Sequence, residues 1–73
     1  MDIDKLIEII SLVLENKKNI TADSKLKEDL GICSFDMIMI IADIEKNGEF
    51  KVNINEFKKE MTIKELRNII VKV

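Results

Sequence analysis

The sequence has no proline, histidine, tryptophan or tyrosine, and it has only two glycines and one cysteine. A fold of many short strands needs more turn residues than this, so helices are expected instead. A single cysteine cannot form an internal disulfide. Without histidine there is neither a Cys/His zinc site nor a catalytic dyad or triad that uses imidazole. No acid/base pair suited to an enzyme is recognisable, and we therefore expect a protein that is not an enzyme.

Charge and length narrow the class of protein further. The 12 basic and 14 acidic residues give a net charge of −2, and the basic residues form no block longer than a pair. Nucleic acid is therefore not an expected partner. Charged residues from Asp2 to Glu8 interrupt the first apolar stretch, so neither a signal peptide nor membrane insertion is expected. With 73 residues, 47% of them hydrophobic, we expect one small domain over residues 1–73 in the cytoplasm.

Two segments rich in apolar residues predict the first two helices. Apolar residues recur at spacings of three and four in the first segment, which predicts a helix over residues 3–16 capped by Asp2 or Asp4. In residues 20–32 the apolar residues follow no sustained helical or strand periodicity, which predicts a long packed loop. Loops of this length within a small domain are uncommon and usually functional. In the second segment Ser34 is a favoured N-cap residue. The apolar residues that recur at this spacing in the first helix are Ile3, Leu6, Ile7, Ile10, Val13 and Leu14.

The second helix is predicted from Phe35 to Asn47 and is apolar around most of its circumference, with Gly48 as its stop. Steps of 100° per residue leave one polar stripe, and Met39 lies within it. An exposed methionine is therefore predicted. The polar stripe consists of Asp36, Asp43, Lys46 and Asn47.

The remaining residues predict a short helical turn and a last helix. Asn53 or Asn55 can cap a turn that carries Phe57, and residues 62–65 (TIKE) have the capping-box pattern. Apolar residues at helical spacing follow as far as Val73. The sequence therefore predicts an all-α domain, a four-helix bundle with three longer helices and one short third helix.

Residues 43–48 (DIEKNG) begin like a calcium-binding EF-hand loop, with acids at alternate positions and glycine in the sixth. The twelfth position is Ile54, where a bidentate glutamate is needed. We therefore expect no metal site here.

Ser34 has two interpretations that its spacing leaves open. Its oxygen can cap the helix by accepting a hydrogen bond from an early helical N–H. Alternatively its hydroxyl is an attachment point, because free N–H groups and the positive end of the helix dipole favour an attached phosphate there.

The pattern around Ser34 resembles the acyl carrier protein family, including peptidyl and D-alanyl carriers, along nearly the whole chain. Residues 23–26 (DSKL) and 28–31 (EDLG) are similar to the carrier loop, and Ser34-Phe35-Asp36 matches the serine, large apolar residue and acid of the D-S-L-D box. The agreement continues through the second helix and ends with TIKEL at residues 62–66, without a gap.

This resemblance implies that the Ser34 hydroxyl is joined by a phosphodiester to 4'-phosphopantetheine, which a phosphopantetheinyl transferase takes from coenzyme A. The thiol of that arm carries acyl or aminoacyl groups as thioesters. The implied partners are acyl-loading and acyl-transfer or condensing enzymes of fatty acid, polyketide, nonribosomal peptide or D-alanyl pathways. The resemblance further implies a monomer.

Three residues depart from the family pattern. Cys33 stands where aspartate is usual, and we expect it to be a partly buried loop residue, with a reactive thiol as the alternative. Met39 and Lys46 replace residues that are often acidic. We therefore expect partners to dock mainly through apolar contacts. The predicted partner-binding residues are Phe35, Asp36, Ile38, Met39, Ala42 and Glu45.

A second interpretation of the same pattern is an unmodified paralogue. Such a protein would keep the bundle and the recognition helix and act as a small protein–protein interaction module. Replacing Ser34 by alanine separates the two, since a carrier would lose its function and an interaction module only a cap.

Overall fold

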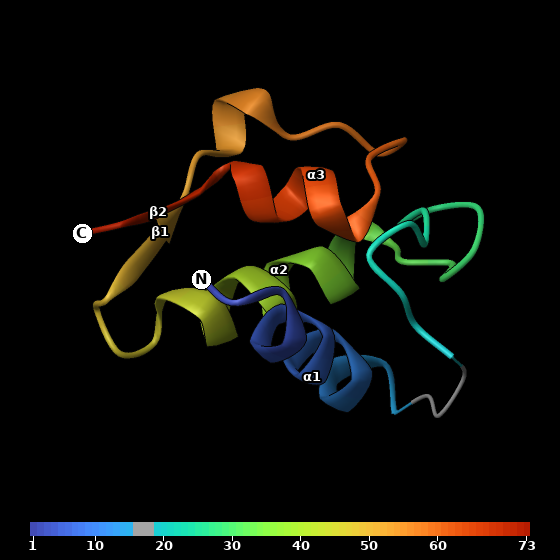
Figure 1. The fold of residues 1–73 in the computed structure, drawn as a ribbon, viewed down its shortest axis with the longest axis horizontal. Helices are drawn as coiled ribbons and strands as arrows, with labels where there is room; N and C mark the ends of the chain where they lie inside the picture. The colour runs from blue at the N-terminus through green and yellow to red at the C-terminus, as the bar shows by residue number, and fades with distance from the viewer. Residues whose placement is uncertain (16–18) are drawn as a thin grey trace.

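The computed structural model describes residues 1–15 and 19–73 of the chain (Figure 1). Its elements in chain order are α1 (Ile3–Leu14), α2 (Ser34–Glu45), β1 (Phe50–Val52), the 3-10 turn η1 (Ile54–Glu56), α3 (Ile63–Asn68) and β2 (Ile70–Lys72). The long loop before α2 lies at one end of the molecule, and the two strands lie at the other (Figure 1).

The core lies among the helices. α1 packs against both α2 and α3, while β1 packs against α2. Side chains from all three helices and from the long loop meet there and are completely or almost completely buried. The largest of these are Leu6, Ile10, Leu26, Ile40, Ile63 and Leu66.

The helix predicted over residues 3–16 is present as α1. Asp2 caps it, because its Oδ1 accepts a hydrogen bond from the Asp4 N–H at 3.3 Å. The helix ends earlier than predicted, since Glu15 takes a left-handed conformation with φ of 51°. Residue 16 of the predicted helix lies outside the described residues.

The prediction of a packed loop over residues 20–32 is confirmed. Leu26 is buried in the core, and the loop backbone pairs with the segment that leads into α3. The Leu26 N–H donates to the Met61 carbonyl at 2.9 Å, and the Ile63 N–H donates to the Ser24 carbonyl at 3.0 Å. These backbone bonds between the loop and the segment before α3 hold the loop in one place without regular secondary structure.

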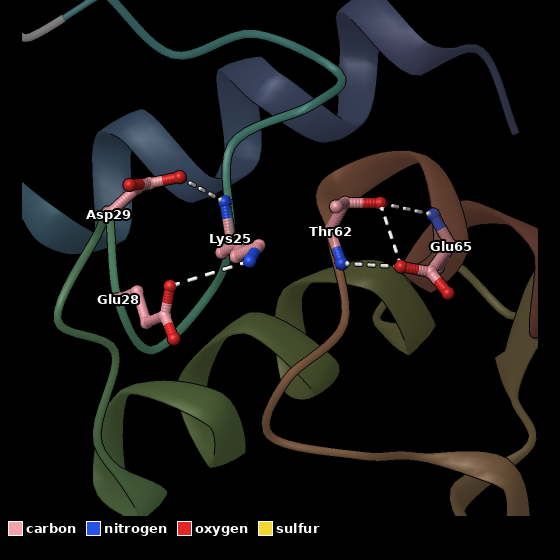
Figure 2. A network of polar contacts seen from close by, with 5 residues as sticks. All are labelled: Lys25, Glu28, Asp29, Thr62 and Glu65. Carbon is pink, nitrogen blue, oxygen red and sulfur yellow. Dashed lines mark hydrogen bonds and ion pairs between the residues drawn. The ribbon is translucent and has the colours of Figure 1, made fainter.

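The start of α3 follows the predicted capping box. Thr62 Oγ1 accepts a hydrogen bond from the Glu65 N–H at 3.2 Å, and Glu65 Oε1 accepts one from the Thr62 N–H at 3.1 Å (Figure 2). The reciprocal pair satisfies two backbone donors at the first turn.

The prediction of a last helix reaching Val73 is wrong. α3 ends at Asn68, and Ile70–Lys72 forms β2, antiparallel to β1 with Val52 opposite Ile70. Residues 69–71 are all β-branched, which favours extended backbone, and the β1 segment supplies a hydrogen-bonding partner. The buried Ile69 and Ile70 satisfy the helical spacing and the strand equally well, so the apolar pattern did not distinguish them.

The predicted short third helix is the single 3-10 turn η1, which follows Asn53 as expected. The Asn53 side chain donates to Glu56 Oε2 at 3.1 Å and leaves the turn without a side-chain N-cap. The domain is therefore small and mostly helical, as predicted, but it has a short antiparallel strand pair that the predicted four-helix bundle did not include. Within the described residues, every helix is too short or too polar to cross a membrane.

Candidate functional site

The site is centred on Ser34, which is the first residue of α2. The N-cap is Cys33, with extended φ and ψ of −96° and 175°, so the prediction that Ser34 caps the helix is wrong by one residue. Ser34 is exposed, and none of the hydrogen bonds among the described residues involves its hydroxyl. The oxygen that the sequence suggested as a cap is therefore free for other chemistry.

Asp36 is the N3 residue of a capping box at this helix start, and it binds back to the N-cap residue Cys33. Its Oδ2 accepts hydrogen bonds from the Cys33 N–H at 3.2 Å and from the Cys33 thiol at 3.3 Å. This carboxylate also lies in the first turn, where the helix dipole favours a negative charge. Cys33 is exposed rather than partly buried as expected, and its side chain faces Asp36.

The N-terminus of α2 offers backbone donors beside Ser34. The first intrahelical bond near this point runs from the Met37 N–H to the Cys33 carbonyl at 3.0 Å. The N–H groups before Met37 have no helical carbonyl to pair with, which is general for the first turn of an α-helix. Together with the positive dipole end they favour a phosphate attached at this place.

The loop before α2 sets the position of Ser34. The Ile32 N–H donates to the Leu26 carbonyl at 2.9 Å, so the end of the loop is fastened to a residue of the core. Gly31 allows the turn because its φ is 63°, a conformation that L-residues with side chains rarely adopt.

Lys25 further stabilises this turn. Asp29 Oδ2 accepts a hydrogen bond from the Lys25 N–H at 2.8 Å, and the Lys25 ammonium lies 3.4 Å from Glu28 Oε2 (Figure 2). Residues 23–31 therefore form a hydrogen-bonded loop that fixes the position of Ser34 at the start of α2. These residues also carried part of the family resemblance.

A hollow of about 410 Å³ opens beside Ser34, between the end of the loop, the start of α2 and the segment after η1. Its walls are mostly apolar, and two lysines belong to its lining. The lining residues are Leu26, Lys27, Gly31, Ile32, Cys33, Ser34, Met37, Phe57 and Lys59. A larger hollow of about 510 Å³ lies against β1 and Val71 and contains no residue of the loop or of the α2 start.

The residues at this end of α2 fit a phosphopantetheine group. The Ser34 hydroxyl is exposed and available for a phosphodiester, and the helix N-terminus beside it favours an attached phosphate. The apolar walls of the hollow suit the hydrocarbon part of a pantetheine arm. Sequence reasoning missed Lys27, Phe57 and Lys59, because only the fold brings their segments together.

The predicted partner-facing residues divide into two groups. Phe35 and Ile38 are about two-thirds exposed, Met39 is 40% exposed as predicted, and Ala42 is exposed beside them. The two acids are engaged within the chain: Asp36 binds Cys33, and Glu45 Oε2 accepts a hydrogen bond from the Val52 N–H at 3.0 Å. The exposed part of this helix face is therefore apolar.

Comparison with known proteins gives one result. The family model described as "Phosphopantetheine attachment site" matches residues 4–70, which include Ser34, the long loop and the hollow. No curated protein and no solved structure matches the chain at a significant level. Domains of this family bind 4'-phosphopantetheine covalently and are generally non-catalytic carriers. The match confirms the resemblance found in the sequence motifs, and the chain belongs to the family of phosphopantetheine attachment domains.

Proposed function

We propose that this protein is an acyl carrier protein and that Ser34 is the residue that holds its 4'-phosphopantetheine. The observation that carries this proposal is the exposed Ser34 hydroxyl at the first position of α2, unused by the cap and beside an apolar hollow. Membership of the family identifies the cofactor as 4'-phosphopantetheine, and the geometry supports Ser34 as its attachment point.

In the attachment step, Ser34 acts as the nucleophile. Its Oγ attacks the phosphorus of coenzyme A that bears the pantetheine, and a new P–O bond forms. The bond to the other phosphate breaks, adenosine 3',5'-bisphosphate leaves, and the serine proton goes to a base of the transferase. The α2 N-terminus favours the negative charge that remains on the protein.

The attached group supplies a thiol that forms thioesters with acyl or aminoacyl groups. The chain itself presents that thiol at high effective concentration to successive enzymes, which is what a flexible tether achieves without new contacts. It offers no histidine for acid/base chemistry, so loading and transfer belong to the partners. We assign the protein to fatty acid, polyketide or related biosynthesis, acting as a cytoplasmic monomer.

Partners of this carrier dock on the exposed face of α2. Phe35, Ile38, Met39 and Ala42 supply apolar contact area next to Ser34. Aromatic residues and methionine are enriched at the cores of protein–protein interfaces. This surface therefore suits a phosphopantetheinyl transferase and the enzymes that load and unload the arm.

The proposal is tested by the intact mass of the protein after incubation with coenzyme A, magnesium and a broad-specificity phosphopantetheinyl transferase. We expect a gain of one phosphopantetheine in the wild type and none in Ser34→Ala. Ser11→Ala, which removes a hydroxyl from α1, is the matched control and should gain the same mass. No gain in a folded wild-type sample would contradict the proposal and favour an unmodified interaction module.

A further inference from the structure

Lys27 and Lys59 both line the hollow beside Ser34, although 31 residues separate them in the sequence. Lys27 comes from the loop, and Lys59 comes from the segment between η1 and α3. Both residues are exposed and belong to the lining of a mostly apolar hollow. The fold therefore brings two lysines to the hollow that Ser34 also lines.

Neither lysine is neutralised within the described part of the chain. The ion pairs found there join Lys5 to Glu8 and Lys25 to Glu28. Asp36, the acid nearest in sequence to Ser34, binds the N–H and thiol of Cys33. Two cations beside Ser34 are thus available to an anion.

We propose that Lys27 and Lys59 bind the phosphodiester of the phosphopantetheine arm and hold the first part of the arm in the hollow. This inference rests on the proposed function, since it requires the phosphodiester on Ser34. A phosphodiester carries one negative charge and acceptor oxygens, which suit lysine ammonium groups.

The hollow matches the chemistry of the arm beyond its phosphate. The carbon next to the phosphoester in pantetheine is followed by a gem-dimethyl group, which is apolar. Leu26, Ile32, Met37 and Phe57 offer apolar walls of the same character. With about 410 Å³, the space falls within the range of about 300 to 1,000 Å³ that is usual for small-molecule sites.

Docking of the arm would be partial, because both lysines are exposed. A single exposed ion pair typically changes an equilibrium by a factor of about 1.4 to 5. Removing both charges is therefore expected to lower the ratio of docked to free arm by about 2-fold to 25-fold. This weak hold fits a carrier, since partner enzymes must withdraw the arm.

The test uses holo-protein whose arm carries ¹⁵N at its two amide groups. In the wild type at low salt, we expect arm amides with reduced mobility and shifted resonances. Lys27→Gln combined with Lys59→Gln should move both observables toward those of a free arm. Salt at 1 M, where the screening length is about 3 Å, should act on the wild type in the same direction.

Lys51→Gln combined with Lys64→Gln is the matched control, because it removes two exposed lysines away from this hollow. It should leave the arm as it is in the wild type. The inference is overturned if the wild-type arm is as mobile as in the Lys27/Lys59 variant, or if the control variant frees the arm equally. An intact mass without the arm would overturn the proposed function, whereas a modified protein with a free arm overturns this inference alone.

Discussion

Glu45 Oε2 lies 3.0 Å from the Val52 backbone nitrogen and accepts its hydrogen bond. This contact ties the last turn of α2 to β1 across the turn that contains Gly48. Val52 is 3% exposed, so its N–H needs a protein partner. Glu45, which the sequence suggested as a partner-binding acid, therefore has a structural role at the junction of helix and strand.

Replacing Glu45 by alanine should lower the free energy of unfolding by about 1 to 3 kcal/mol, because a backbone donor with little access to water loses a charged acceptor. Glu45→Gln keeps an acceptor oxygen and should lose clearly less. Urea unfolding followed by circular dichroism measures both. Equal stability of Glu45→Ala and the wild type would show that the contact contributes nothing.

The capping box of α3 gives a second prediction. Thr62→Ala removes the acceptor for the Glu65 N–H and should destabilise the protein by about 0.5 to 2 kcal/mol. Thr62→Ser, which keeps the hydroxyl, should restore most of that loss. If thermal unfolding showed the same stability for Thr62→Ala and Thr62→Ser, the hydroxyl would have no capping role.

Ser34→Ala should leave stability within about 0.5 kcal/mol of the wild type, because Ser34 lies inside the helix and not at its N-cap. This differs from the loss expected for a capping serine. Denaturant unfolding of the apo-protein decides between them. A loss of more than about 1 kcal/mol would mean that the Ser34 oxygen is used as a cap after all.

The apolar face of α2 gives a prediction about partners. Phe35→Ala should lower kcat/KM of the transferase by 10-fold or more, since truncating a central aromatic contact costs about 2 kcal/mol or more. Leu12→Ala, which truncates an exposed apolar residue of α1, is the control and should change kcat/KM little. The reaction should persist at high salt, because the exposed contacts are apolar. Complete loss of modification at 1 M salt would contradict apolar docking.

The sequence predicted the parts of the fold that depend on local periodicity. α1 and α2 follow from apolar spacing around 3.6 residues, and the start of α3 follows from the Thr62–Glu65 pattern. The C-terminal strand did not follow, because β2 depends on pairing with β1, about 20 residues earlier in the chain. Short apolar segments rich in isoleucine and valine suit a helix or a strand, and only the partner decides.

The site was predictable to a similar extent. Ser34 was found because its neighbours carry the family motif, and Met39 because helical geometry places it among polar residues. The bonds of Asp36 and Glu45 were not predicted, since both acids had been assigned to partners. Lys27 and Lys59 have no sequence signal, because their common position arises from the folding of two separate segments.

The most direct test of the central claim is peptide mapping of the modified protein under reducing conditions. Trypsin cleavage after Lys27 and Lys46 releases residues 28–46, a peptide in which Ser34 carries the only side-chain hydroxyl. We predict that this peptide gains one phosphopantetheine and that fragmentation places it on Ser34. Placement on any other residue, or modification of a different peptide, would contradict the assignment of Ser34 as the attachment point.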